Sequence, residues 1–257
     1  MSQPAVPSTL YEMVDICHRL ADKGMVSATD GNISVRNREG TFYATRSSVH
    51  KGDITINDIV EVDRSGKLIS GTGKPSTELK MHLFIYDKRP DVHAVVHAHP
   101  TFATAFAAAG QALEKPVFPE ILVMLGKVPL APYGTPSTDE LPESLRPFVQ
   151  DHNAVLLANH GAVTYDQTLK QAFFAMEKLE HAAQITLYAR MLGGERVLSE
   201  AQIKKLVAVS EKSYGKHIPL RHIQQFLDAT SPNNETQYTE KDVYEIVKRV
   251  VQRLEEK

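Results

Sequence analysis

The chain has 257 residues with 42% hydrophobic and 23% charged side chains, values that are ordinary for a globular protein with a full core. Its net charge is −2 and it has no basic run, which excludes the surface that would follow a nucleic-acid backbone. No apolar run is long enough to span a membrane and "MSQPAVPST" lacks a signal-peptide pattern, so we expect a cytoplasmic protein.

The hydrophobic pattern predicts a series of helices and strands within one large domain, residues 1–227. The series is a helix over 8–23 capped by Ser8 or Thr9, strands over 32–37, 41–45, 58–63 and 67–70, a helix over 76–89 opened by a Ser/Thr cap, a strand over 93–99, helices over 101–110 and 138–149, two strands within 154–166, and a helix over 168–192. Most strands come in hairpins with helices interspersed. This order predicts an α/β fold of three layers, α/β/α, with a largely antiparallel central sheet.

The composition changes after Phe226. Residues 228–238 are polar and rich in turn formers, which is typical of a linker. Residues 239–257 then place apolar side chains at three- and four-residue steps, namely Val243, Ile246, Val247, Val250, Val251 and Leu254. Lys, Arg and Glu occupy the other face. The pattern predicts a tethered amphipathic helix at the C-terminal end of the sequence.

Two histidines stand two residues apart at the end of an apolar run, "VVHAHP". Because side chains at i and i+2 of a strand point to the same face, His97 and His99 are expected to project together. Two neighbouring imidazoles form half of a zinc site, and a catalytic zinc needs a third ligand. His160 in "LLANHGAV" is the best candidate, since it also ends an apolar strand and precedes the flexible Gly161.

Three turns are rich in glycine and hydroxyl groups. "GTGKPSTELKMH" carries Ser76, Thr77 and Glu78 at an expected helix start, where backbone N–H groups and hydroxyls suit a phosphate. A plain helix cap is the alternative for this turn. "GNIS" and "TRSSVHKGD" are weaker signals of the same kind when each is taken alone.

In their order and spacing, "DGNISVR", "TRSSVHKGDIT", "GTGKPSTELKMHLFIYDKRPDVHAVVHAHP" and "LLANHGAV" resemble the zinc-dependent class II aldolase and adducin-head family, over about residues 8–225. The resemblance implies one zinc per subunit, held by His97, His99 and His160. It also implies that Glu78 is the carboxylate in the fourth position and the general acid/base. The substrate phosphate would be held by Asn32, Ser47, Ser48, Ser76 and Thr77. A homotetramer with its sites at subunit interfaces is implied as well.

Four positions leave the details of that resemblance open. Ser48 stands where a glycine is common, and Arg46 replaces a small residue or proline, so Arg46 either contacts the phosphate or faces solvent. Aldolases of this type use a tyrosine of a neighbouring subunit as proton donor, and Glu120 falls at that place here. Tyr214 in "SYGK" resembles a tyrosine near the end of the family's fold, with a buried core tyrosine as the alternative.

The expected reaction is cleavage of a deoxy-ketose 1-phosphate, such as L-fuculose or L-rhamnulose 1-phosphate, to dihydroxyacetone phosphate and lactaldehyde. The alternatives within the family are a methylthioribulose-phosphate dehydratase, a ribulose-phosphate 4-epimerase and a decarboxylase. A non-enzymatic adducin-like scaffold is the alternative outside enzymes, although the complete set of His97, His99, His160 and Glu78 favours an enzyme.

The polar linker and terminal helix resemble the peptides that carry enzymes into bacterial microcompartments. An apolar stripe of this size could dock into a groove of a shell protein. The alternatives are a helix that packs on its own or a neighbouring subunit, a tail without function, or a membrane-surface helix. The mixed charge of the polar face argues against the last of these.

Overall fold

The computed structural model describes residues 7–214 and Phe226. The linker predicted over 228–238 and the helix predicted over 239–257 lie outside the described residues. The helices are α1 (Ser8–Asp22), α2 (Leu79–Lys88), α3 (Thr101–Ala108), α4 (Pro119–Met124), α5 (Glu140–Ser144), α6 (Leu169–Met191) and α7 (Glu200–Tyr214), with a 3-10 turn at Ile56–Asp58. The strands are β1 (Asn32–Arg36), β2 (Phe42–Thr45), β3 (Ile59–Val62), β4 (Leu68–Ser70), β5 (Ala94–Ala98), β6 (Leu130–Ala131), β7 (Ala154–Leu157) and β8 (Gly161–Asp166).

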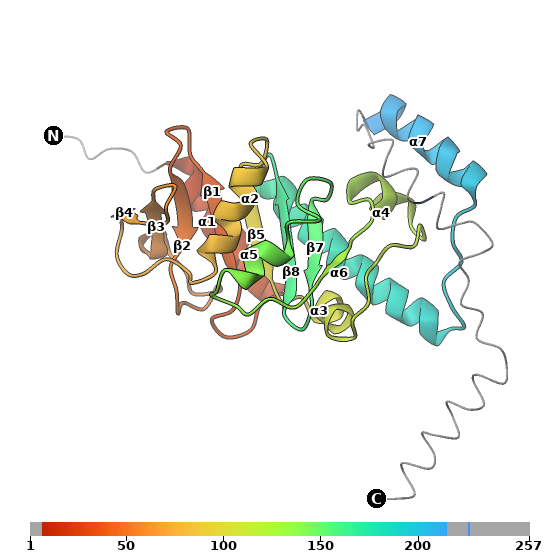
Figure 1. Ribbon diagram of the computed structural model, residues 1–257, viewed down its shortest axis with the longest axis horizontal. Helices are drawn as coiled ribbons and strands as arrows, with labels where there is room; N and C mark the ends of the chain where they lie inside the picture. Colours follow the sequence, from red (N-terminus) through yellow and green to blue (C-terminus); the bar gives the residue numbers. More distant parts are fainter. Residues whose placement is uncertain (1–6, 215–225, 227–257) are drawn as a thin grey trace, which may run out of the picture.

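Within residues 7–214, eight strands form one sheet in the order β4-β3-β2-β1-β5-β8-β7-β6 (Figure 1). Each neighbouring pair is antiparallel except β6 and β7, which are parallel. The largely antiparallel sheet predicted from the hairpin pattern is therefore confirmed. β5 lies near the middle and all five of its residues are buried.

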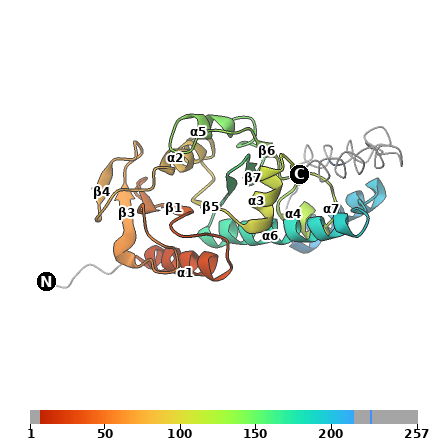
Figure 2. The ribbon, with the colours of Figure 1, turned by 90° about the horizontal axis from the view of Figure 1, so that it is seen from below.

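Helices cover both faces of this sheet (Figure 2). The core between α1, α6 and the sheet includes Ile16, Val96 and Met176, and the core on the α2 and α5 side includes Ile85 and Val95. Val95 and Val96 enter opposite cores because successive side chains of a strand point to opposite faces. The three-layer α/β/α architecture is confirmed. Among the described residues, no helix is both long enough and apolar enough to cross a membrane.

One helix cap and two helix boundaries differ from the prediction. α1 begins at Ser8, as predicted, but Pro7 precedes it and neither Ser8 nor Thr9 caps it with a side-chain hydrogen bond. α2 begins at Leu79 rather than residue 76, with Glu78 as the residue that precedes it. The helix predicted over 138–149 is only Glu140–Ser144, because Pro147 has no N–H group and disfavours helical backbone in the residue before it.

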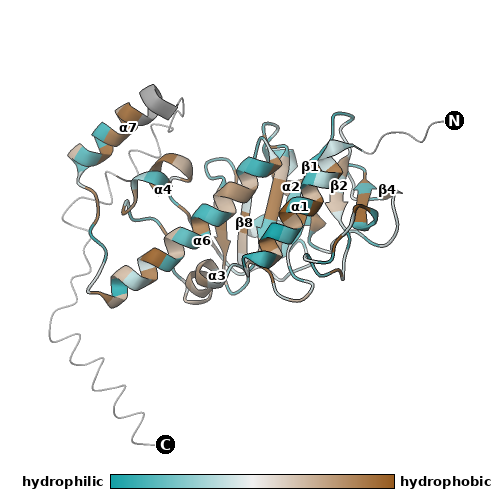
Figure 3. Ribbon diagram, turned by 180° about the vertical axis from the view of Figure 1, so that it is seen from behind, coloured by the Kyte–Doolittle hydropathy of each residue, from teal (hydrophilic) through white to brown (hydrophobic). Residues whose placement is uncertain are grey.

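Four short or peripheral elements were not predicted: the 3-10 turn, α4, β6 and α7. Leu122 of α4, Ile203 of α7 and Phe226 are buried against one another in a small separate core. Figure 3 shows apolar and polar residues side by side along α7, which is the pattern of a helix that buries one face. This small core fixes α4 and α7 beyond the end of the main sheet (Figure 1).

Candidate metal centre and active-site cleft

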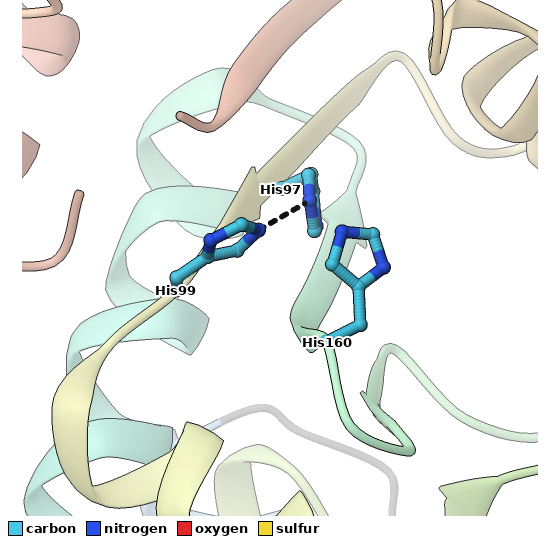
Figure 4. A group of neighbouring side chains, drawn as sticks. All are labelled: His97, His99 and His160. Atoms are coloured by element: carbon cyan, nitrogen blue, oxygen red, sulfur yellow. Dashed lines mark hydrogen bonds between the residues drawn. The ribbon is translucent and has the colours of Figure 1, made fainter. Parts of the chain in front are cut away.

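The three predicted histidines meet at the end of β5 (Figure 4). His97 lies in the strand and is fully buried, His99 lies one residue beyond it, and His160 lies in the turn between β7 and β8. One ligand nitrogen from each of the three lies within 4.8 Å of the others, and Nε2 of His97 and Nε2 of His99 are 3.2 Å apart. The sequence spacing thus predicted a grouping that the fold produces.

The second ring nitrogen of two histidines is already engaged. Nδ1 of His97 lies 2.9 Å from the carbonyl oxygen of Ala162, across the β5–β8 pairing. Nδ1 of His99 lies 3.3 Å from a carboxylate oxygen of Asp30. When Nδ1 carries the proton in such contacts, Nε2 keeps its lone pair and can bind a metal ion. Asp30, His99 and a metal would form the carboxylate–histidine–metal arrangement that orients many protein ligands.

Gly161 lets the turn that carries His160 lie close to the end of β5, because it has no side chain. The sequence had indicated a flexible glycine instead. A Cβ atom at this position would stand 2.6 Å from the carbonyl oxygen of Ala98 and 2.6 Å from Cδ2 of His99. Gly31, before β1, is comparable, because its φ is +74° and its Cβ would stand 3.0 Å from the carbonyl oxygen of His97. Both glycines let neighbouring backbone approach the end of β5.

Glu78 faces two of the three histidines from the start of α2. Its Oε2 is 3.3 Å from Nε2 of His97, and its Oε1 is 3.1 Å from Nε2 of His160. The amide nitrogen of Asn32 donates a hydrogen bond of 2.8 Å to the same Oε2. Burial alone would raise the pKa of the Glu78 carboxyl, but the charges and hydrogen bonds of His97 and His160 outweigh it and hold that pKa well below its usual value.

The donor set fits a transition-metal ion. Burial lowers the pKa of His99 to about 4, and His97 and His160 add to the effect, so His99 is neutral near pH 7. Imidazole nitrogens with an adjacent carboxylate are ligands that zinc accepts in catalytic sites. If both Nε2 atoms carry lone pairs, these lone pairs repel each other at a separation of 3.2 Å. A metal ion bound by both nitrogens removes that repulsion. The three histidines therefore form a site that fits a metal ion.

The hydroxyl-rich turns line the same cleft as the histidines. The cleft has a volume of about 360 Å³, and among its lining residues are Asn32, Ser47, Ser48, Ser76, Thr77, Glu78, His99 and His160. The turn after β2 and the turn before α2 are joined by backbone, because the N–H of Ser47 donates to the carbonyl of Lys74 and the N–H of Ser76 donates to the carbonyl of Thr45. All five residues that the resemblance assigns to phosphate thus share one cleft; their role remains a prediction.

The structure shows the surroundings of Ser48 and Arg46, the two residues of these turns that depart from the usual family pattern. Ser48 has a φ of +61°, in the left-handed region where a side chain costs energy and glycine does not. Arg46 donates from Nε to Asp58 with a distance of 2.7 Å, so its guanidinium is tied to a neighbouring loop. Because Arg46 also lines the cleft, both alternatives for its guanidinium, contact with a phosphate and exposure to solvent, remain predictions.

The two remaining predicted residues lie apart from this cleft. Glu120 is exposed in the first turn of α4 and does not line the cleft of its own chain. This position is compatible with the predicted role at the site of a neighbouring subunit. Tyr214 is the last residue of α7, but its side chain lies outside the described residues. Their predicted roles rest on the sequence.

Other polar residues near the site were not assigned a role from sequence. Asp30 contacts His99, and the buried Lys51 lines the cleft. Beneath the site, Ser34 Oγ lies 2.7 Å from Nδ1 of His82 and 2.9 Å from the hydroxyl of Tyr86. Asp30 and Lys51 stand inside the quoted turns, but only the register of the sheet brings Asp30 to His99. The spacing of His82 and Tyr86, four residues apart on α2, was the available signal for the buried network.

Comparison with known proteins shows which family this chain resembles. Residues 11–187 match the family described as class II aldolase and adducin N-terminal domain. A 5-deoxy-D-ribulose 1-phosphate aldolase of Bacillus thuringiensis serovar kurstaki is 34% identical over 207 residues, which cover 80% of this chain and 96% of the relative. A 3-oxo-tetronate 4-phosphate decarboxylase of Pectobacterium atrosepticum is 35% identical over 178 residues, 68% of this chain and 81% of the relative.

A solved structure of a protein in this family has a similar fold. The structure described as L-fuculose 1-phosphate aldolase superimposes with a TM-score of 0.74 at 32% sequence identity. It covers 81% of this chain and 97% of the other chain.

Proposed function

Since the chain belongs to the class II aldolase and adducin N-terminal domain family, we propose that it is a zinc-dependent aldolase that cleaves a deoxy-ketose 1-phosphate. It is an enzyme of the lyase class, and its relatives include aldolases and a decarboxylase. L-Fuculose, L-rhamnulose and 5-deoxy-D-ribulose 1-phosphate are the substrates that we propose to compare. The first two would give lactaldehyde and the third acetaldehyde, each together with dihydroxyacetone phosphate.

The arrangement of Glu78 between two histidines carries this proposal. Its two carboxylate oxygens lie 3.3 Å and 3.1 Å from Nε2 of His97 and of His160, in the cleft that the serine and threonine turns also line. A metal site alone would suit many reactions. A metal site with an adjacent carboxylate, in a cleft whose hydroxyl groups suit a phosphate, would be suited to breaking a bond next to the carbonyl of a phosphorylated sugar.

Aldol cleavage of such a ketose needs two proton transfers. The C3–C4 bond breaks as the C4 hydroxyl loses its proton and becomes an aldehyde, and C3 later gains a proton to give dihydroxyacetone phosphate. A zinc ion held by His97, His99 and His160 would supply a Lewis acid for the substrate's oxygens. Glu78 would hold or deliver the proton at C3, and Asn32, which donates to Oε2, would orient the carboxylate.

The turns around the cleft would fix the other end of the substrate. Ser47, Ser48, Ser76 and Thr77 present hydroxyls and backbone N–H groups there, which suit the oxygens of a phosphate. Fixing the phosphate places the carbonyl and the C3–C4 bond at the histidines, and such positioning contributes a large part of catalysis.

Decarboxylation is the second candidate, and the relative from Pectobacterium atrosepticum supports it. Loss of carbon dioxide from a 3-oxo acid also leaves an electron pair on the carbon next to a carbonyl, so the same site serves both reactions. We favour aldol cleavage because the Bacillus thuringiensis relative, whose similarity extends over 80% of this chain, is named as an aldolase. A 4-epimerase and a dehydratase would use the same metal site and remain outcomes of the assay.

We also propose a homotetramer in which each site is completed by Glu120 of the partner subunit, as proton donor to the leaving aldehyde. Support comes from the exposed position of Glu120 on α4, away from the cleft of its own chain. Tyr214 stays the other candidate for that proton transfer. Size-exclusion chromatography with light scattering tests the assembly, and a monomer with full activity would contradict it.

Incubation of the zinc-loaded protein with each sugar phosphate tests the reaction. We expect formation of dihydroxyacetone phosphate from at least one of the three ketose 1-phosphates, measured by its coupled reduction. Release of carbon dioxide from 3-oxo-tetronate 4-phosphate, without dihydroxyacetone phosphate from any ketose, would establish the decarboxylase instead. A product that keeps all its carbons would indicate an epimerase or a dehydratase.

For the C-terminal segment we propose recruitment to a microcompartment shell, which would place the enzyme in that part of the cytoplasm. The support is the sequence pattern of residues 228–257, a polar linker followed by an apolar stripe on one helix face. A fluorescent protein fused to these residues is expected to gather at assembled shells. Diffuse fluorescence beside intact shells would overturn this part of the proposal.

A further inference from the structure

Lys51 is a buried cation in the wall of the candidate active-site cleft. Its exposed fraction is 2%, yet it lines the cleft together with the hydroxyl-bearing residues and Glu78. Nζ donates to the carbonyl oxygen of Val49 at 2.8 Å and to that of Thr29 at 3.3 Å. These carbonyls belong to the turn after β2 and the turn before β1, so Lys51 lies where the two turns meet.

The charge of Lys51 has no carboxylate partner among the residues that the structure describes. Asp30 acts on it only from beyond ion-pair distance, and Asp30 itself lies 3.3 Å from Nδ1 of His99. Arg46, the other cation of the cleft, is different, because its Nε lies 2.7 Å from a carboxylate oxygen of Asp58. The cleft therefore holds one paired cation and one unpaired cation.

An ammonium group buried without an acid is costly, because two carbonyl contacts replace only part of its hydration. Burial accordingly lowers the pKa of Lys51, against the opposing influence of Cys17 and Asp30. The ammonium has three N–H donors and the two carbonyls occupy two of them. A negatively charged group in the cleft would take the third donor and neutralise the charge.

We propose that Lys51 is the residue that pairs with the phosphate of the substrate, and that it makes the enzyme select phosphorylated over unphosphorylated sugars. This inference rests on the proposed function, in which Ser47, Ser48, Ser76 and Thr77 hold the phosphate through neutral groups. Lys51 adds the one full positive charge that those groups lack. A charge-assisted hydrogen bond is about twice as strong as a neutral one, so the charge sets the preference for an anion.

Binding of sn-glycerol 3-phosphate to the zinc-loaded protein tests the inference by calorimetry. This probe carries a phosphate on three carbons but has no carbonyl, so it cannot be cleaved, and glycerol is its unphosphorylated match. Lys51→Met keeps most of the length of the side chain and removes its charge. We expect it to weaken binding of sn-glycerol 3-phosphate by about 10- to 100-fold, with the zinc content unchanged.

Lys51→Gln separates the charge from the link between turns. The amide of Gln can still donate to the carbonyls of Thr29 or Val49, so a structural role would be restored by it, whereas pairing with phosphate would not. Lys88→Met is the matched control, since it removes the same charge from a lysine that is bound to Asp87 at 2.9 Å and does not line the cleft. We expect Lys51→Gln to bind as weakly as Lys51→Met, and Lys88→Met to bind within about threefold of the unaltered protein.

Two results would overturn the inference. One is an affinity of Lys51→Gln for sn-glycerol 3-phosphate equal to that of the unaltered protein. The other is an unaltered protein that binds sn-glycerol 3-phosphate no better than glycerol. Neither depends on the reaction that the enzyme catalyses, because the probe does not react. A failed aldolase assay with intact, Lys51-dependent binding would instead reject the proposed reaction and retain the phosphate site.

Discussion

The ring of His99 packs directly against the backbone of Gly161. A Cβ atom at residue 161 would stand 2.6 Å from Cδ2 of His99 and equally close to the carbonyl oxygen of Ala98, distances that real Cβ atoms do not show. Gly161 directly follows His160 in the chain. One position without a side chain therefore sets the approach of two candidate ligands, one just after β5 and one in the turn between β7 and β8.

Gly161→Ala is expected to displace either His99 or the turn that carries His160, because backbone on one side and a packed ring on the other leave no room. A ligand shift of this kind weakens metal binding, and changes around metal ligands typically cost about 10- to 100-fold in affinity. Competition with a chromogenic zinc chelator measures the change. Gly40→Ala is the control, since a Cβ there meets nothing within 4 Å. Equal zinc affinity of the two variants would contradict the prediction.

Removal of a ligand imidazole tests the metal site itself. His97→Ala and His160→Ala each leave two of the three nitrogens that lie within 4.8 Å of one another, too few for a stable catalytic zinc site. Metal analysis after dialysis is expected to give about one zinc per chain for the unaltered protein and much less for either variant. His93→Ala, a change outside the cluster, serves as the control. Full zinc retention by both ligand variants would reject the assignment.

Glu78→Gln separates metal binding from catalysis. The amide has almost the shape of the carboxylate but cannot accept and return a proton, so we expect zinc to be retained and turnover to fall by about 100- to 10,000-fold. Zinc content and the rate with the best sugar phosphate are measured on the same sample. A variant with zinc and nearly full turnover would exclude Glu78 as the general acid/base.

The grouping of the three histidines could be predicted from the sequence because each signal is local. His97 and His99 share a face through the two-residue period of a strand, and His160 ends an apolar run of its own. The orienting residues could not be predicted in the same way. Asp30 reaches His99 only because β1 pairs with β5 in the register that puts Asn32 beside His97.

For the fold too, elements marked by a local sequence pattern could be predicted, and elements that depend on contacts distant in sequence could not. Hairpin strands and long helices were predictable from periodicity, and the three-layer architecture followed from their order. β6 has two residues and joins the sheet by a parallel pairing with β7, so no local pattern marks it. α4 is short, and its position depends on Leu122 packing against Ile203 and Phe226 from far along the chain.

Ser48 has a backbone conformation that favours glycine. At a φ of +61° a side chain costs roughly 1 kcal/mol, and Ser48→Gly removes that cost while it adds freedom to the unfolded chain. We expect the free energy of unfolding in urea to stay the same or rise by up to about 1 kcal/mol. Ser47→Gly is the control, because Ser47 donates from Oγ to the carbonyl of Pro75 at 2.9 Å and should lose stability. Similar losses in both variants would contradict strain at Ser48.

The buried network under the site predicts a dependence of stability on pH. His82 is 1% exposed, and its Nδ1 lies 2.7 Å from Oγ of Ser34. Among the described residues its Nε2 has no hydrogen-bond partner. Burial lowers the pKa of His82 to about 3, and the charge of the nearby His97 acts in the same direction. In the unfolded chain this histidine would titrate near its ordinary value of about 6.5.

The sign of the effect follows from proton uptake. Between about pH 6.5 and pH 3 the unfolded chain binds a proton at His82 that the folded protein does not bind, so stability is complete above this range and falls as the pH falls through it. The loss from this one group is about 1.4 kcal/mol per pH unit. His99, whose pKa is also lowered, acts in the same direction. The comparison therefore needs a variant that lacks only His82.

His82→Leu fills a similar volume and cannot take up a proton, so its stability should depend less on pH than that of the unaltered protein. Urea unfolding of both proteins, freed of metal with a chelator, is measured at pH 7.5, 6.5, 5.5 and 5. Between pH 6.5 and pH 5 we expect the unaltered protein to lose about 2 kcal/mol more than the variant. Any constant offset from the lost contact with Ser34 cancels in this difference. Parallel curves would mean that His82 is protonated in the folded protein as easily as in the unfolded chain.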